Sequence, residues 1–240
     1  MAILRAAFQA LQRNYGPLLF YIGVAFAIYS VRLSLDALVI APKSEEIAEN
    51  ILRLYSIAID IAAVAVVAMA QTIAFSRIGR EVDKPMWRVV DDVEAVRLFY
   101  KLWLLLGLIN IASPRFMDAV VRTEDVAVLL TLRIMWLTGA VMLILFGSAV
   151  MFYGRVGREE VGEAFSTIGR QFPKILLIVI VGIFFGLFLI ELQPELPLWA
   201  WPALAIADAY IDCLFFASMW LVCIYHRDEY DPPDDEDFDF

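Results

Sequence analysis

Six long apolar blocks constrain this chain more than any other feature of its sequence. A stretch of about 18 or more apolar residues is long enough to cross the hydrocarbon core of a bilayer. Lipid offers no partners to backbone polar groups, so such a segment must satisfy them internally as a helix. The sequence therefore predicts six transmembrane helices, at residues 17–40, 51–75, 96–113, 127–153, 174–192 and 199–225.

The composition agrees with this interpretation. Of the 240 residues, 62% are hydrophobic, whereas soluble domains usually contain about 45–50%. The predicted fold class is therefore all-α, a polytopic helical membrane protein in which residues 1–227 form the transmembrane domain. The formal charge of −9 is concentrated in the remaining residues, 228–240, which hold eight acids and no base.

The distribution of Lys and Arg predicts the orientation, because basic residues favour the cytoplasmic side of a membrane. With both termini in the cytoplasm, thirteen basic residues fall on the cytoplasmic side and four on the other. We therefore expect a multi-pass protein of the cytoplasmic (inner) membrane.

An internal repeat is visible in the loops. Residues 77–81 read Arg-Ile-Gly-Arg-Glu, and residues 155–159 read Arg-Val-Gly-Arg-Glu. Amphipathic stretches precede the first and fifth blocks, and a middle copy near residues 86–96 is recognisable by pattern. We predict three units, about 1–80, 81–158 and 159–227, each an amphipathic helix followed by a two-helix hairpin. The amphipathic helices either lie on the membrane surface or extend the spans.

The stretch from Gly157 to Pro173 carries a family resemblance. A loop in which Arg155 and Arg158 flank Val156 and Gly157 precedes Glu163-Ala164-Phe165 on an amphipathic segment, and the basic Lys174 precedes a long apolar span. This pattern resembles the YciC-like bacterial inner-membrane proteins and the membrane domain of some glycerophosphodiester phosphodiesterases. The resemblance implies an inner-membrane protein with about six helices. It implies no enzymatic activity, because the soluble catalytic domain of those phosphodiesterases is absent from this sequence.

Charged residues inside predicted spans are the main candidates for a functional site, because their burial in lipid is costly. The predicted topology places all of them in the outer half of the membrane, with two bases against five acids. They form either a cavity that accepts a cation or proton, or a structural network of ion pairs. They are Arg32, Asp36, Asp60, Arg133, Glu191, Asp208 and Asp212. Two uncharged polar residues, Gln71 and Asn110, are expected to form interhelical hydrogen bonds.

Two further sets of residues suggest contacts outside the spans. Loop arginines beside the cytoplasmic span ends either bind anionic lipid headgroups or only mark the topology; they are Arg77, Arg80, Arg155 and Arg158. The acidic tail should be disordered alone, and its Tyr230, Phe238 and Phe240 either dock on a basic protein partner or stay solvated.

The chemistry of an enzyme is not recognisable in this sequence. It holds one histidine, and its two cysteines lie in the last apolar block, where small buried thiols are the simplest interpretation. No phosphate-binding loop or nucleophile–histidine pattern is present. We expect no enzyme, metal, cofactor or nucleic acid, and an accessory or organising role with lipid and protein partners, as a homo-oligomer or a subunit of a larger complex. The alternative is a small transporter or channel that uses the outer-half carboxylates.

Gly139, Gly182 and Gly186 are expected to permit close helix packing.

Overall fold

The computed structural model describes residues 2–35, 49–82, 89, 91–120 and 126–230, and the regular elements in these ranges are all helical. Six helices are long and apolar enough to cross a membrane, which confirms the predicted multi-pass helical fold. They are α2 (Tyr15–Leu35), α4 (Glu49–Val82), α5 (Asp92–Val120), α6 (Val126–Phe152), α8 (Phe172–Leu192) and α9 (Trp201–Tyr230). The shorter helices are α1 (Ala2–Arg13) and α7 (Arg158–Arg170), and two 3₁₀ turns, η2 (Gln193–Glu195) and η3 (Leu198–Ala200), connect α8 to α9.

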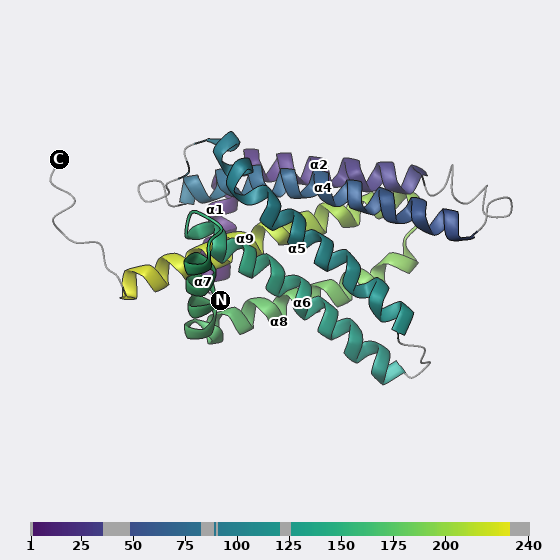
Figure 1. The fold of residues 1–240 in the computed structure, drawn as a ribbon. Helices are drawn as coiled ribbons and strands as arrows, with labels where there is room; N and C mark the ends of the chain where they lie inside the picture. Colours follow the sequence, from purple (N-terminus) through teal and green to yellow (C-terminus); the bar gives the residue numbers. More distant parts are fainter. Residues whose placement is uncertain (1, 36–48, 83–88, 90, 121–125, 231–240) are drawn as a thin grey trace.

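The six long helices run side by side and give the bundle two ends (Figure 1). The terminal end, at the left of Figure 1, holds α1, α7 and the last turns of α9. The hairpin end, at the right, holds the last turn of α2, the first turn of α4, and the two 3₁₀ turns. The predicted topology makes the terminal end cytoplasmic.

Helix α9 is the central element of the bundle. It packs against α1, α2, α4, α6 and α8, and 56% of its most apolar window is buried inside the protein, the largest share for any of the six spans. Side chains on several faces of α9 therefore contact protein, which makes this helix a place where polar groups can be kept away from lipid.

Aromatic side chains fill the half of the bundle nearer the terminal end. Phe75 of α4 stacks on Phe216 of α9 with ring centroids 4.3 Å apart. Phe75 and Trp103 of α5 meet in an edge-to-face arrangement with ring centroids 5.0 Å apart. Trp220 continues the cluster, with its ring 5.2 Å from those of Phe216 and Phe152. Such pairs add to the stability gained by burial, so this half of the bundle is tightly packed.

Two of the three glycines that we expected at close contacts lie where α8 approaches α6. A Cβ atom on Gly182 would lie 2.6 Å from Val141, and one on Gly186 would lie 2.5 Å from Leu137. A side chain at either position would push the two helices apart. Gly139 is different, because its Cβ would meet nothing within 4 Å; the prediction for that residue is wrong.

Helix α7 crosses the ends of α6 and α8 at the terminal end (Figure 1). The chain turns into it at Gly154, whose φ of +88° is a conformation that glycine adopts without strain. Ala164 and Ile168 bury one face of α7 while Phe165 is exposed. The predicted middle amphipathic helix lies partly outside the described residues, at 86–88 and 90, and residues 92–96 form the first turns of α5 instead.

Candidate functional site

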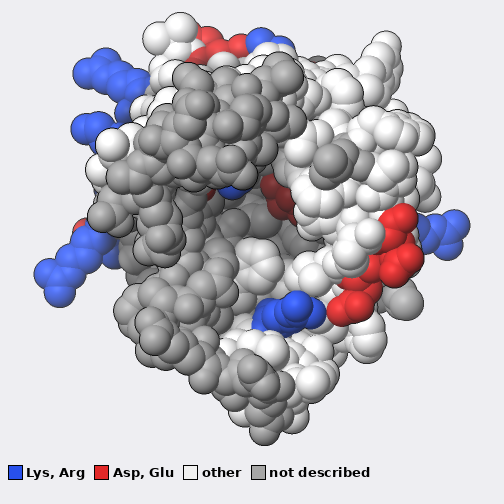
Figure 2. Space-filling model, turned by 90° about the vertical axis from the view of Figure 1, so that its right-hand side faces the viewer, with Lys and Arg blue, Asp and Glu red and all other residues white. Residues whose placement is uncertain are grey.

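A cavity of about 410 Å³ lies between α2, α4, α5 and α9, near the end of α8. Its lining begins in mid-bundle with Tyr21 and Gln71 and reaches Arg32 and Gln193 at the hairpin end. Figure 2 looks onto that end and shows a hollow near its centre, with acidic atoms visible inside. The volume falls within the range of about 300–1,000 Å³ that is typical of small-molecule sites.

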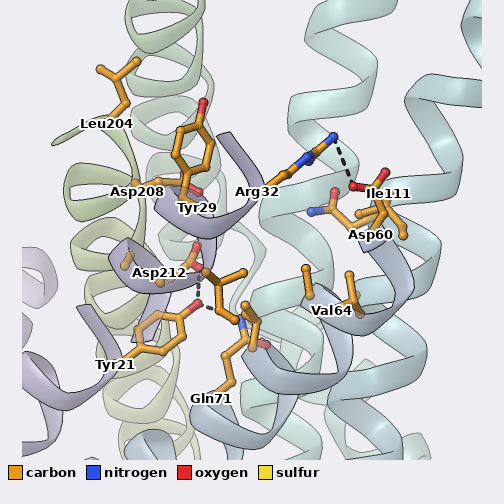
Figure 3. Close-up of a pocket in the computed structure, with 18 of the residues that line it drawn as sticks. Tyr21, Tyr29, Arg32, Asp60, Val64, Gln71, Ile111, Leu204, Asp208 and Asp212 are labelled. Atoms are coloured by element: carbon orange, nitrogen blue, oxygen red, sulfur yellow. Dashed lines mark hydrogen bonds and ion pairs between the residues drawn. The ribbon is translucent and has the colours of Figure 1, made fainter. Parts of the chain in front are cut away.

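Two carboxylates of α9 lie on the cavity wall (Figure 3). Asp208 and Asp212 are four residues apart, so they share one helix face and are separated by about 6 Å along the axis. Asp208 makes no hydrogen bond or ion pair with any residue that the structure describes. One face of α9 thus carries two acids about one turn apart, and both line the cavity.

Asp212 is held in place by a hydrogen-bonded chain from two other helices (Figure 3). Gln71 Nε2 of α4 donates to the Tyr21 hydroxyl of α2 over 3.0 Å. The hydroxyl in turn donates to Asp212 Oδ2 over 2.8 Å. Because the amide supplies the hydrogen for its own bond, the phenol proton is directed to the carboxylate. This chain fixes the orientation of the deeper acid.

An ion pair lies nearer the mouth of the cavity. Arg32 Nη2 of α2 and Asp60 Oδ1 of α4 are 3.0 Å apart, and the Asp60 side chain is only 6% exposed (Figure 3). The pair joins two neighbouring helices and neutralises a carboxylate that would otherwise be costly to bury. Arg32 thus forms an ion pair with Asp60, and it is the only base among the described residues that line the cavity.

Several buried polar atoms near the cavity have no hydrogen-bond partner among the described residues. They include the indole nitrogens of Trp103 and Trp136 and the side-chain oxygen of Asn110. Trp103 and Asn110 line both the main cavity and an adjoining one of about 190 Å³, which Trp136 also lines. Buried polar groups are usually paired with protein or water, so these atoms indicate an occupant that forms hydrogen bonds rather than a lipid chain.

The aromatic cluster forms the floor of the cavity on the side of the terminal end. The ring of Tyr21 lies 5.5 Å from that of Phe75, which stacks on Phe216. Phe216 and Trp220 are fully buried. The cavity is thus closed toward the terminal end and open toward the hairpin end.

The structure brings four of the seven predicted in-span charges to this cavity: Arg32, Asp60, Asp208 and Asp212. Arg133 and Glu191 lie elsewhere and face each other over 3.5 Å with both side chains exposed. Asp36 lies outside the described residues. The expected interhelical bond of Gln71 is present, whereas the side-chain oxygen of Asn110 has no partner among the residues that the structure describes.

Sequence reasoning missed Tyr21 and Trp103 as members of the site. An aromatic residue in an apolar block usually belongs to the core or to the membrane interface, and nothing local distinguishes these two. The packing of α2 against α9, and of α5 against α4, brings these two side chains to the cavity that the acids line.

Three of the four predicted loop arginines have protein partners at the terminal end, and two of these, Arg77 and Arg80, lie within α4 and not in a loop. Arg77 Nε lies 3.0 Å from Asp92 Oδ2, and Arg80 also pairs with Asp92. Arg155 binds Glu160, and the guanidinium lowers the pKa of that carboxyl, with help from the backbone N–H of Glu160 itself. Arg158, the first residue of α7, is exposed. Binding of these arginines to lipid headgroups remains a prediction.

The tail prediction concerns residues outside the described ranges, because 231–240 and the side chain of Tyr230 are not described. Among the described residues, no group of three or more His, Cys, Asp or Glu side chains is placed to hold a metal ion.

The fold and the site together define a class: a multi-pass helical membrane protein with an acidic cavity that opens at one end of the bundle. Comparison adds nothing more specific to that class. No protein-family model, curated protein or solved structure matches the chain.

Proposed function

We propose that this protein binds a small cation in the cavity and is a small, non-enzymatic transporter of such cations. The single observation that carries the proposal is the pair Asp208 and Asp212, two acids on the wall of one cavity whose described lining holds no base except the paired Arg32. Two carboxylates about 6 Å apart repel each other by about 3 kcal/mol at an effective dielectric constant of about 20. A bound cation relieves this repulsion, which is a source of affinity.

The closed floor favours a transporter over a channel. A channel needs a continuous path, but Phe75, Phe216 and Trp220 block this one toward the terminal end. Access from one side at a time is the behaviour of transporters that alternate between two conformations. With the terminal end in the cytoplasm of the inner membrane, as the Lys and Arg pattern predicts, the cavity receives its cation from outside.

The threefold internal repeat is part of this proposal. Helix α1 precedes the hairpin of α2 and α4, just as α7 precedes the hairpin of α8 and α9. Transporters often consist of repeated units that rock against one another around a binding site at their interface. What supports this part of the proposal is that the cavity lining comes from the first, second and third predicted units. We rank transport ahead of the accessory role, whose main support is a tail that the structure does not describe.

Calorimetry with a monovalent organic cation tests the proposal. The full chain in lipid nanodiscs is titrated with n-butylammonium in an amine-free buffer. We expect saturable binding to the wild type and loss of at least roughly tenfold in affinity in the double variant D208N/D212N, because each change removes a counter-charge. The matched control is Glu191→Gln, which alters an exposed acid at the same end of the bundle and outside the cavity lining.

Two results would reject the proposal. One is the absence of any binding of n-butylammonium to well-folded wild-type protein. The other is equal binding to the wild type and the double variant, which would place the cation elsewhere on the molecule.

A further inference from the structure

We infer that the cavity takes a linear organic dication, an alkyl diamine whose two ammonium groups lie about one helical turn apart. The inference rests on the proposed function and narrows it to one class of solute. It depends on the charges of the cavity, on the spacing of its acids and on the chemistry of the remaining lining.

Among the described lining residues, two acids are left without a base. The charged side chains among the described lining residues are Arg32, Asp60, Asp208 and Asp212. Arg32 lies 3.0 Å from Asp60 and neutralises it. Asp208 and Asp212 remain, so an occupant that balances the charge of the cavity carries two positive charges.

The spacing of these acids fits two separate ammonium groups. Four residues of α9 place the carboxylates about 6 Å apart along the helix axis. The Tyr21 hydroxyl lies at the inner end of the cavity and donates to Asp212 Oδ2 over 2.8 Å. This bond keeps the Asp212 carboxylate from turning toward Asp208 to form one shared site. One ammonium group therefore lies beside each acid, with the alkyl chain between them.

The rest of the lining suits the other parts of such a molecule. The wall next to the two acids is apolar and small, with Ala205 and Ala209 on α9 and Val67 on α4. The unpaired side-chain oxygen of Asn110 is an acceptor for an N–H group. Trp103, which is 2% exposed, brings an aromatic ring to the cavity, and its indole N–H has no partner among the described residues. An indole N–H only donates and an ammonium group has no acceptor, so a water molecule that enters with the diamine accepts this hydrogen bond.

A divalent metal ion is a poorer match for the same two charges. Calcium binds six to eight oxygen ligands at short range, and magnesium needs a nearly ideal octahedron. No group of three or more acidic, histidine or cysteine side chains is placed for this among the described residues. A cavity of about 410 Å³ is also far larger than a single ion requires.

A comparison of two ligands on the wild-type protein tests the inference without any variant. The full chain in nanodiscs is titrated by calorimetry with 1,4-diaminobutane and with n-butylammonium, which have the same four-carbon chain and differ by one charge. We expect the diamine to bind at least roughly tenfold more tightly, the equivalent of one additional ion pair in a partly buried site. Magnesium and calcium chloride at matched ionic strength serve as competitors that we expect to be ineffective.

The single variants provide the second part of the test. In Asp208→Asn or Asp212→Asn one carboxylate remains, so the two ligands should bind with affinities within roughly twofold of each other. Glu191→Gln, outside the cavity lining, should retain the full preference for the diamine.

The outcomes separate this inference from the proposed function. Equal affinity of the wild type for both ligands overturns the dication and leaves the cation site intact. Displacement of the diamine by magnesium or calcium at lower concentration also overturns it, in favour of a metal ion. If neither amine binds, the inference and the proposed function both fail.

Discussion

The two halves of α9 differ sharply in packing, although they belong to one continuous helix. From Cys213 to Cys223, nearly every residue is buried, and the fully buried side chains include Phe216, Met219 and Trp220. From Trp201 to Asp212, Ala209 is the only buried residue. The change from mostly unburied to mostly buried residues occurs at Asp212, which accepts a hydrogen bond from Tyr21 at the floor of the cavity.

This difference shows how the protein keeps a cavity in a bundle of modest size. Tight aromatic packing in one half stabilises the fold. This stability compensates for the cost of keeping acidic side chains and an open cavity in the other half. Functional sites are often less stable than the scaffold that carries them. The packed half should therefore respond to substitutions as a protein core does, and the cavity half should respond as a binding site does.

The largest expected effect is in the packed half. Trp220→Ala removes a fully buried ring that contacts Phe152, Phe216 and the backbone at Gly79. We expect a loss of about 3–5 kcal/mol in the free energy of unfolding, as for other large-to-alanine changes in a core. Leu204→Ala shortens a side chain of the cavity wall and so enlarges the cavity, and it should lower the free energy of unfolding by less than about 1 kcal/mol. Denaturant unfolding in detergent micelles measures both, and similar losses would contradict the contrast between the halves.

A smaller loss is expected at the mouth of the cavity. Arg32→Gln leaves the buried Asp60 carboxylate without its counter-charge. Since Arg32 is itself 45% exposed, we expect a loss of about 1–2 kcal/mol, below the 3–5 kcal/mol of fully buried pairs.

The matched control for that change is Arg133→Gln. It breaks an exposed pair with Glu191 whose closest atoms are 3.5 Å apart, and such pairs contribute about 0–1 kcal/mol. Equal effects of the two substitutions on the unfolding midpoint would show that Asp60 does not depend on Arg32 for its burial.

The fold was largely predictable from the sequence, because apolar length decides a transmembrane helix almost alone. A long helix covers nearly all of the described part of each of the six predicted spans, including the one with Arg97 and Lys101 at its start; residues 36–40 of the first span lie outside the described residues. Both of those side chains are exposed, so they escape burial while their helix begins at Asp92. Helix ends were less predictable, since charged residues continue a helix beyond the apolar block.

The site was only partly predictable, because it depends on which helices are neighbours in space. The cost of placing a charged side chain inside a membrane span identified Asp208 and Asp212 as candidates, and their spacing of four residues placed them on one helix face. The sequence left open whether Arg32 or Arg133 pairs with Asp60. In the structure Arg32 forms this ion pair, because α2 packs against α4. Tyr21 had no signal at all, since its role arises from a bond to a residue 191 positions away.

The cavity half should also contain substitutions that stabilise the protein. Asp208→Asn removes a carboxylate that no described residue pairs, and with it the repulsion from Asp212. We expect a gain of about 1 kcal/mol in the free energy of unfolding together with weaker cation binding, the trade between stability and function typical of binding sites. Glu195→Gln, an exposed acid in η2, is the control and should change neither quantity. A loss of stability in D208N would mean that Asp208 is a structural residue.

The smallest effect is expected beyond the packed half, where α7 covers the terminal end. Arg155 and the backbone N–H of Glu160 lower the pKa of the Glu160 carboxyl. A group whose pKa is lowered by folding contributes stability above its unfolded pKa and loses that contribution as the pH falls through the folded value. Glu160→Gln should therefore speed hydrogen exchange of the α7 amides at neutral pH by roughly twofold to fivefold, a modest effect because the Arg155 side chain of the pair is exposed. The difference from the wild type should shrink as the pH falls below the usual glutamate value of 4.5, because the wild-type carboxyl is then protonated too. A difference that stays constant across this range would mean that α7 is held by its buried face, through Ala164 and Ile168, and gains nothing from the ion pair.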